Sequence, residues 1–312
     1  VRSRRQRQMC IRDSNQADFS NINFNGYELT LGSALTHLRL CYDADSFVKW
    51  EGSSFYTGDG SLTFICPLRI PGSILESTGG AITLERGGYV PEESRLTLHD
   101  TTLELQGEPL RVFYGSTLDL KNSSIETNGF PIYIADGTLK VEGTVDLSGI
   151  VPDKTKSILR LAGDATVIGD NNNTLSVYTL DLADFALTLD DNMAGLSVSQ
   201  ALTLNAGTEQ IISGGADLSL NGGVAVNAGT LSSTGGTLSA SNLNLGAEGT
   251  LNIQGGTLTL PAGGTAVAGA TFATSGTVIQ LGGALDVKDT WTSTNTDLSL
   301  TANASLSSTS AV

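Results

Sequence analysis

Charged and aromatic residues are scarce in this chain. Of its 312 residues, 16% are charged and 6% are aromatic, whereas about 25% of the residues of a soluble domain are usually charged. From Leu161 onward the chain has one lysine, Lys288, and no arginine. Such an acidic surface repels nucleic acid, so we expect no nucleic-acid partner. Long apolar runs of about 18 residues are also absent, so no segment is predicted to insert into a membrane.

Cysteine and histidine are almost absent as well. Beyond Ser14 the only cysteines are Cys41 and Cys66, and the only histidines are His37 and His99. A catalytic cysteine needs a neighbouring base, and with so few histidines we expect none. We favour two buried thiols; the alternative is a Cys41–Cys66 disulfide, which suits an exported protein.

The first segment, 1–14, differs from the rest. It holds five of the 17 lysines and arginines and lacks the apolar core of a secretory signal. It closely resembles translated sequencing-adapter sequence, so we leave it out of the fold prediction. We therefore expect the native start, with any signal peptide, to be missing. Without this segment the formal net charge is −19.

What the chain does have is a repeat, with a step of about 20 residues. Gly229-Thr230-Leu231 recurs as Gly249-Thr250-Leu251, and an apolar residue recurs at the same step at Leu218, Leu238, Leu258, Val278 and Leu298. Upstream, Leu96 and Leu98 return at Leu118 and Leu120, a slightly longer step. Within each unit apolar and polar residues alternate, as in TLEL and TLTL, which predicts strands with one buried face.

Such a period with short strands predicts an all-β, single-stranded β-solenoid with about 20–22 residues per coil and almost no helix. We expect irregular coils or a cap over 15–60. One continuous solenoid then covers 61–312, with coils of about 21–22 residues as far as position 160 and of about 20 residues after it. The five apolar residues above should form one buried ladder, and Thr237, Thr257 and Thr277 a hydroxyl ladder outside it.

The stretch NAGTLSSTGGTLSASNLNLGAEGTLNIQGGTLTL, 227–260, resembles the repeats of filamentous-haemagglutinin-type adhesins and autotransporter passengers. The resemblance implies a right-handed parallel β-helix from a bacterial protein that is secreted or held at the outer-membrane surface. It implies no catalytic residue.

We therefore predict a non-enzymatic, adhesin-like stalk, part of a longer protein, whose partners are surface glycans or proteins. Exposed aromatic residues could stack on sugars, but we expect Trp50, Phe55 and Tyr56 to pack inside the first coils instead.

The alternative function is a polysaccharide lyase or hydrolase, because the β-helix also hosts such enzymes. These need clustered carboxylates or basic residues on one face. Neighbouring coils carry three carboxylates and two cations, and their spacing does not require them to converge: Glu126, Glu142, Asp146, Arg111 and Lys140. We expect them to form a solvated charged face, and we predict no catalytic or cofactor residue.

A calcium site is a weaker hypothesis. A step of about 20 residues places Asp170 above Asp190 and Asn172 above Asn192, and their oxygens are of the kind that Ca²⁺ takes as ligands. Aspartate and asparagine also stabilise turns without metal. We favour that interpretation, and so predict no metal and no cofactor.

Overall fold

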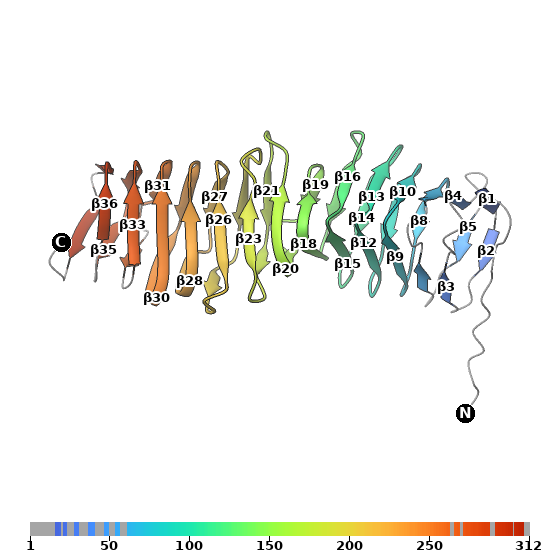
Figure 1. Cartoon of the computed structure of the whole chain (residues 1–312), viewed down its shortest axis with the longest axis horizontal. Helices are drawn as coiled ribbons and strands as arrows, with labels where there is room; N and C mark the ends of the chain where they lie inside the picture. The colour runs from blue at the N-terminus through green and yellow to red at the C-terminus, as the bar shows by residue number, and fades with distance from the viewer. Residues whose placement is uncertain are drawn as a thin grey trace, which may run out of the picture. The chain divides into compact units, whose positions relative to one another are not determined.

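The computed structural model describes the strands of residues 16–56 and then residues 61–262, 265–268, 271–287, 291–301 and 303–308. All regular structure in these residues is strand, so the prediction of an all-β chain is confirmed. Two compact units, 1–153 and 154–312, are described separately. In each, parallel strands from successive coils stack as a β-solenoid, as predicted (Figure 1). Residues 1–14, Cys41 and Trp50, and the side chains of His37 and Phe55, lie outside the described part.

Unit 1 has three parallel sheets, and the coils from β7 to β18 contribute one strand to each. The β10 sheet contains β1 (Gln16–Phe19), β4 (His37–Leu40), β7 (Ser61–Phe64), β10 (Ala81–Leu84), β13 (Thr102–Leu105) and β16 (Ser124–Glu126). The β11 sheet contains β8 (Leu68–Arg69), β11 (Gly88–Val90), β14 (Leu110–Val112), β17 (Ile132–Ile134) and β19 (Ile150–Pro152). The β12 sheet contains β3 (Glu28–Thr30), β6 (Ser54–Tyr56), β9 (Ile74–Thr78), β12 (Arg95–His99), β15 (Thr117–Lys121) and β18 (Thr138–Asp146). A short pair joins β2 (Asn21–Asn23) and β5 (Phe47–Lys49).

Unit 2 has one separate parallel sheet and a second set of strands that pair continuously, in which β20, β28 and β30 have 11, 10 and 13 residues. The β27 sheet contains β21 (Thr174–Val177), β24 (Gly195–Val198), β27 (Asp217–Leu220), β29 (Thr237–Ala240), β31 (Thr257–Leu260), β34 (Val278–Leu281) and β37 (Asp297–Leu300). The remaining strands pair with one another: β20 (Ile158–Ile168), β22 (Thr179–Asp181), β23 (Ala186–Leu189), β25 (Leu202–Leu204), β26 (Gln210–Ser213), β28 (Val224–Ser233), β30 (Asn242–Gln254), β32 (Thr265–Ala268), β33 (Thr271–Ser275), β35 (Ala284–Val287), β36 (Trp291–Thr294) and β38 (Ser305–Ser308).

The core consists of stacked apolar ladders. Leu96 pairs with Leu118, and Leu118 with Leu139, and all three are at most 1% exposed. The steps between these three leucines are 22 and 21 residues. Adjacent strands lie ~4.8 Å apart, so each leucine lies on the one below it. Burial of a leucine stabilises the fold by about 1.5–3 kcal/mol relative to an exposed one.

The ladder predicted for unit 2 differs from the structure at two residues: Val278 is not a member, and Leu298, which pairs with Ile279, is 39% exposed rather than buried. Leu218 pairs with Leu238 and Leu238 with Leu258, but Leu258 pairs with Ile279 rather than Val278. Ile279 and Leu281 alternate as buried residues, whereas Val278 would have placed the polar Gln280 in the core. The coil that starts at Leu258 is therefore longer by a single residue than the coil before it.

The same shift overturns the predicted threonine ladder. Thr237 pairs with Thr257 on the outside, but the next outward residue is Val278. Thr277 is 1% exposed, and its hydroxyl donates to the carbonyl oxygen of Ile253 at 3.0 Å. The hydroxyl row that continues from coil to coil lies two positions further on and contains Ser176, Ser197, Ser219, Ser239 and Thr259.

Buried hydroxyl groups also bond the coils at one corner of unit 1. Ser77, Thr101 and Ser123 are each at most 4% exposed and lie one coil apart. The Thr101 hydroxyl donates to that of Ser77 at 3.1 Å, and the Thr101 backbone N–H donates to the Ser123 hydroxyl at 3.2 Å. Buried polar atoms need such partners, so the corner is held by polar contacts where the ladders end.

The prediction of two buried thiols is wrong for Cys66. Its side chain is 3% exposed and forms a disulfide bond. The other sulfur lies outside the described residues. Disulfides form and persist in oxidising compartments, so the bond is consistent with export.

Candidate functional site

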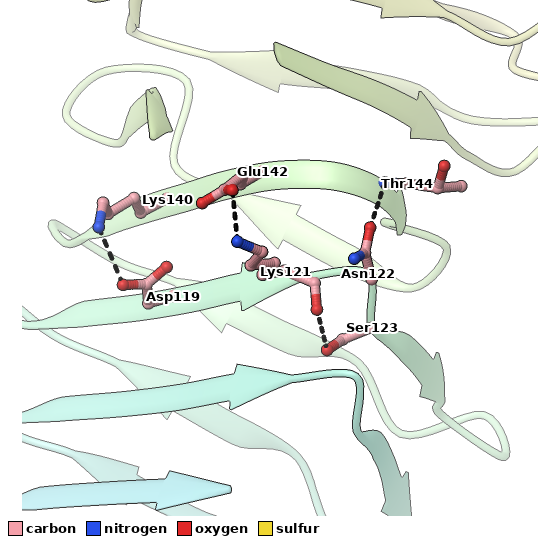
Figure 2. Close-up of polar contacts among 7 residues, drawn as sticks. All are labelled: Asp119, Lys121, Asn122, Ser123, Lys140, Glu142 and Thr144. Atoms are coloured by element: carbon pink, nitrogen blue, oxygen red, sulfur yellow. Dashed lines mark hydrogen bonds and ion pairs between the residues drawn. The ribbon is translucent and has the colours of Figure 1, made fainter. Parts of the chain in front are cut away.

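Unit 1 carries a charged network on the outward side of the β12 sheet. Asp119 on β15 is 2% exposed, and its Oδ2 accepts a hydrogen bond from the Lys140 Nζ at 3.1 Å (Figure 2). A guanidinium nitrogen of Arg95 on β12 forms a second ion pair with the same carboxylate oxygen. The carboxylate is therefore covered by two cations from the coils on either side of it.

A third ion pair in this network joins Lys121 on β15 to Glu142 on β18 (Figure 2). The hydrogen bond to Glu142 and the charge of that carboxylate raise the pKa of Lys121 above its ordinary value. Both side chains are about one-third exposed, and solvent screens such pairs so that they add little to stability. The pair therefore contributes little to the register of β15 and β18, which the buried pair Leu118 and Leu139 already defines.

The chain turns the corner next to this pair. Asn122 has a positive φ of 47°, and its Oδ1 accepts a hydrogen bond from the Thr144 backbone N–H at 3.1 Å (Figure 2). Asparagine tolerates this left-handed backbone better than most residues. The Ser123 hydroxyl donates to the carbonyl oxygen of Lys121 at 2.9 Å (Figure 2). The network thus consists of ion pairs and turn contacts that stabilise the stacked coils.

The five residues of the alternative, enzymatic hypothesis do not come together. Glu126 lies on β16 of the β10 sheet, Arg111 on β14 of the β11 sheet, and Lys140 and Glu142 on β18 of the β12 sheet. These are three different sheets. Asp146, at the end of β18, accepts a hydrogen bond from the Ser148 backbone N–H at 2.8 Å. Only Lys140 and Glu142 share a face, and each is already in an ion pair with a residue of β15.

A different cluster, which the sequence analysis missed, lies on the β11 sheet. Arg69, Tyr89, Arg111 and Tyr133 pair in register on β8, β11, β14 and β17, and we call these four residues the Arg–Tyr row. Each lies one coil period of about 20–22 residues from the next, so the period applied to Arg69 would have found the row. Arginine and tyrosine thus alternate from coil to coil.

Cations and rings stack along this row. The Arg69 guanidinium carbon lies 5.6 Å from the centre of the Tyr89 ring, and that of Arg111 lies 5.5 Å from the centre of the Tyr133 ring. Such cation–π contacts stabilise by ~0.5–1 kcal/mol at exposed sites. The Tyr89 ring also stacks on that of Phe113, with centroids 5.9 Å apart and planes 11° apart. The rings and guanidinium groups therefore hold one another in fixed positions.

A shallow pocket of about 370 Å³ opens beside the Arg–Tyr row. Its lining consists of two prolines, two aromatic rings and one arginine: Pro71, Pro91, Tyr89, Phe113 and Arg69. No carboxylate belongs to this lining. Pro71, Pro91 and Phe113 each follow a member of the row by two positions, so successive coils bring them together. The pocket is an apolar surface with a cation at one edge.

The strands of this face carry positive charge. Every outward position of β8, β11, β14 and β17 is arginine or tyrosine. Neither Arg69 nor Arg111 forms an ion pair with any carboxylate of the described residues. The acidic residues nearest in sequence lie in the flanking turns rather than on the strands: Glu85, Glu92, Glu93, Glu108 and Asp136. The face can therefore bind an anionic group through its two guanidinium groups.

The predicted stacking of the calcium candidates is wrong. Val167 pairs with Leu189, a longer step than predicted, so Asp170 does not lie above Asp190 or Asn172 above Asn192. Each aspartate instead closes its own turn: Asp170 accepts from the Asn172 backbone N–H at 2.8 Å, and Asp190 from that of Asn192 at 2.9 Å. No group of three potential metal ligands of the His, Cys, Asp and Glu types occurs among the described residues.

Of the aromatic residues considered for sugar stacking, the structure describes the side chain of Tyr56 alone. Tyr56 is half-buried at the end of β6 and pairs with Glu76, whereas the side chains of Trp50 and Phe55 are outside the described part.

The part of the chain that the structure describes contains no helix of the length and hydrophobicity that a membrane span requires. No protein-family model, curated protein or solved structure matches this chain.

Proposed function

We propose that the chain is a non-enzymatic structural and binding solenoid, an adhesin-like part of a bacterial protein that is secreted or held at the cell surface. One observation carries the proposal: outward side chains repeat in register from coil to coil. The Arg–Tyr row of unit 1 and the hydroxyl row of unit 2 are both of this kind. Repeated rows on stacked strands give a stiff surface with many equivalent contacts.

Two further features support the proposal. Cys66 forms a disulfide bond, which suits an oxidising compartment outside the cytosol. The candidate charged residues of a lyase or hydrolase lie on three sheets, and Asp119 is already paired with two cations. A general acid or base needs a free carboxyl or amine within reach of the bond that is broken.

A depolymerisation assay tests the absence of catalysis. The purified full chain is incubated with polygalacturonate, alginate and dextran, and the length distribution of each polymer is followed by size-exclusion chromatography. We expect each distribution to stay unchanged. Shortened polymers that depend on the protein would overturn the proposal in favour of the enzyme.

Export is tested separately by producing the chain in the cytosol and in the periplasm of a bacterial host. We expect Cys66 to resist alkylation, before reduction, only in the periplasmic protein. We also expect that protein to melt at the higher temperature. Equal alkylation and equal melting in both preparations would contradict the assignment to an oxidising compartment.

A further inference from the structure

We propose that the Arg–Tyr row and the pocket beside it bind a linear acidic polysaccharide. Arg69 and Arg111 would hold its carboxylate or sulfate groups, while sugar rings pack against Tyr89, Phe113 and the two prolines. The inference rests on the proposed function, because it names the ligand of a binding solenoid.

The spacing of the cations fits a polymer with regularly placed anions. Arg69 and Arg111 lie two coils apart, with Tyr89 between them. At ~4.8 Å per strand their backbones are ~10 Å apart, comparable to the length of two sugar rings. A polymer that carries an anionic group on alternate rings can therefore reach both arginines at once.

Charge complementarity selects the ligand class. The chain as a whole has a formal net charge of −15, which opposes the approach of any polyanion. Local attraction has to come from strands that carry cations and lack carboxylates, and those of the Arg–Tyr row do so. Guanidinium groups bind carboxylate and sulfate-like oxygens through two parallel hydrogen bonds.

The pocket supplies the second element of sugar recognition. Its volume of about 370 Å³ is at the lower end of the ~300–1,000 Å³ typical of ligand sites. Pro71, Pro91 and Phe113 offer C–H and ring surfaces to the apolar face of a sugar. An acidic sugar thus meets a cation and an apolar surface together.

Affinity electrophoresis of the full chain tests the inference. The probes are polygalacturonate, which carries carboxylates, dextran sulfate, which carries sulfate esters, and neutral dextran. We expect retardation by at least one acidic polymer and none by dextran. We expect the double variant Arg69→Gln/Arg111→Gln to bind about tenfold more weakly, since charge-assisted hydrogen bonds are lost. Polygalacturonate and dextran sulfate together show which anionic group is preferred.

Two control variants distinguish binding at the Arg–Tyr row from a general effect of positive charge. Lys154→Gln/Arg160→Gln removes two positive charges from exposed positions of unit 2, which holds no residue of the row, and we expect it to bind like the unchanged protein. Arg69→Lys/Arg111→Lys keeps the charge but loses the planar fork, and we expect intermediate binding. Thermal melting confirms that all variants are folded; Arg69 is exposed, so its loss should not unfold unit 1.

The outcomes are distinguishable from those of the proposed function. No retardation by either acidic polymer, or equal weakening in both glutamine double variants, would overturn the inference and leave a non-enzymatic solenoid. Retardation that depends on the row, together with shortening of the polymer, would support this site and overturn the non-enzymatic function.

Discussion

The Lys140 amine donates a hydrogen bond of 3.1 Å to the carboxylate of Asp119. The Asp119 side chain is only 2% exposed. Arg95 pairs with the same oxygen from the opposite coil. A buried carboxylate is costly without partners, and cations left without their carboxylate repel each other. The stability of this part of unit 1 therefore depends on a single acidic side chain.

We expect Asp119→Asn to lower the free energy of unfolding by about 1–3 kcal/mol, less than for a fully buried pair because both cations are partly exposed. Urea titration measures the change. The matched control is Asp181→Asn, which alters the exposed ion pair with Arg160 and should change the free energy by less than about 0.5 kcal/mol. Equal losses of free energy at Asp119 and Asp181 would contradict a stabilising role of the buried carboxylate.

Valine substitutions at Thr277 and Thr257 test whether the first side chain is buried and the second faces outward. We expect Thr277→Val to destabilise unit 2 by about 0.5–1.5 kcal/mol, because the buried hydroxyl donates to the Ile253 carbonyl oxygen. Thr257 is half-buried on the outward side of β31, so Thr257→Val should be nearly neutral. Thermal or urea unfolding of the two variants provides the comparison. If both valines were neutral, Thr277 would be outside the core.

Gly256 and Gly276 both have a positive φ, of 68° and 58° respectively, and lie at the same corner of successive coils, where Gly276 aligns with Gly255. A Cβ at Gly256 would lie 2.2 Å from the Gly236 carbonyl oxygen, whereas one at Gly276 has no neighbour within 4 Å. We expect Gly276→Ala to cost about 1–2 kcal/mol from backbone strain alone. Gly256→Ala should cost clearly more, since the backbone must also shift. Equal melting temperatures for the two variants would refute this difference.

Asp170 should titrate below its ordinary pKa of 3.8, because the Asn172 backbone N–H and the Asn173 side-chain amide donate to its carboxylate. Because the pKa is lower in the folded state, the charged carboxylate stabilises the turn at every pH above the ordinary pKa of an aspartate. That stabilisation is lost as the pH falls through the lowered pKa. NMR titration of the carboxyl carbon measures it.

Two variants of the same turn check the cause of the shift. Asn173→Ala removes one donor, so the pKa of Asp170 should rise toward 3.8. Asn171 contacts the Asn172 amide rather than Asp170, so Asn171→Ala should leave the pKa of Asp170 where it was. An unchanged pKa in the first variant would show that Asn173 does not stabilise the charged form.

The fold could be predicted because period-2 alternation and the coil step agree over most of the chain. Leu96, Leu118 and Leu139 pair as their spacing indicates. The prediction failed at Val278, which was placed in the buried ladder because a constant coil step was counted from Leu258. The alternation of Ile279 with Leu281 would have identified the buried residues correctly. A solenoid can add a residue in a turn, so alternation within a strand is the safer guide to which side chain is buried.

The candidate site was harder to predict, for a physical reason. The Arg–Tyr row is made of residues a whole coil apart, and nothing local marks them as neighbours. The predicted stacking of the calcium candidates was wrong because it carried the shorter coil of the C-terminal repeats to a place where Val167 pairs with Leu189. The charged residues of the enzymatic hypothesis were close in sequence, but one coil passes through three sheets and places near neighbours on different faces.

The composition of the Arg–Tyr row, with a single residue from each coil, also governs how such a surface can evolve. Duplication of a single coil lengthens every outward row by one residue and every core ladder by one apolar residue, without redesign of either. Substitution at one outward position changes one contact point and leaves the ladders intact. The ligand preference of a β-solenoid can therefore drift point by point while its core is inherited unchanged.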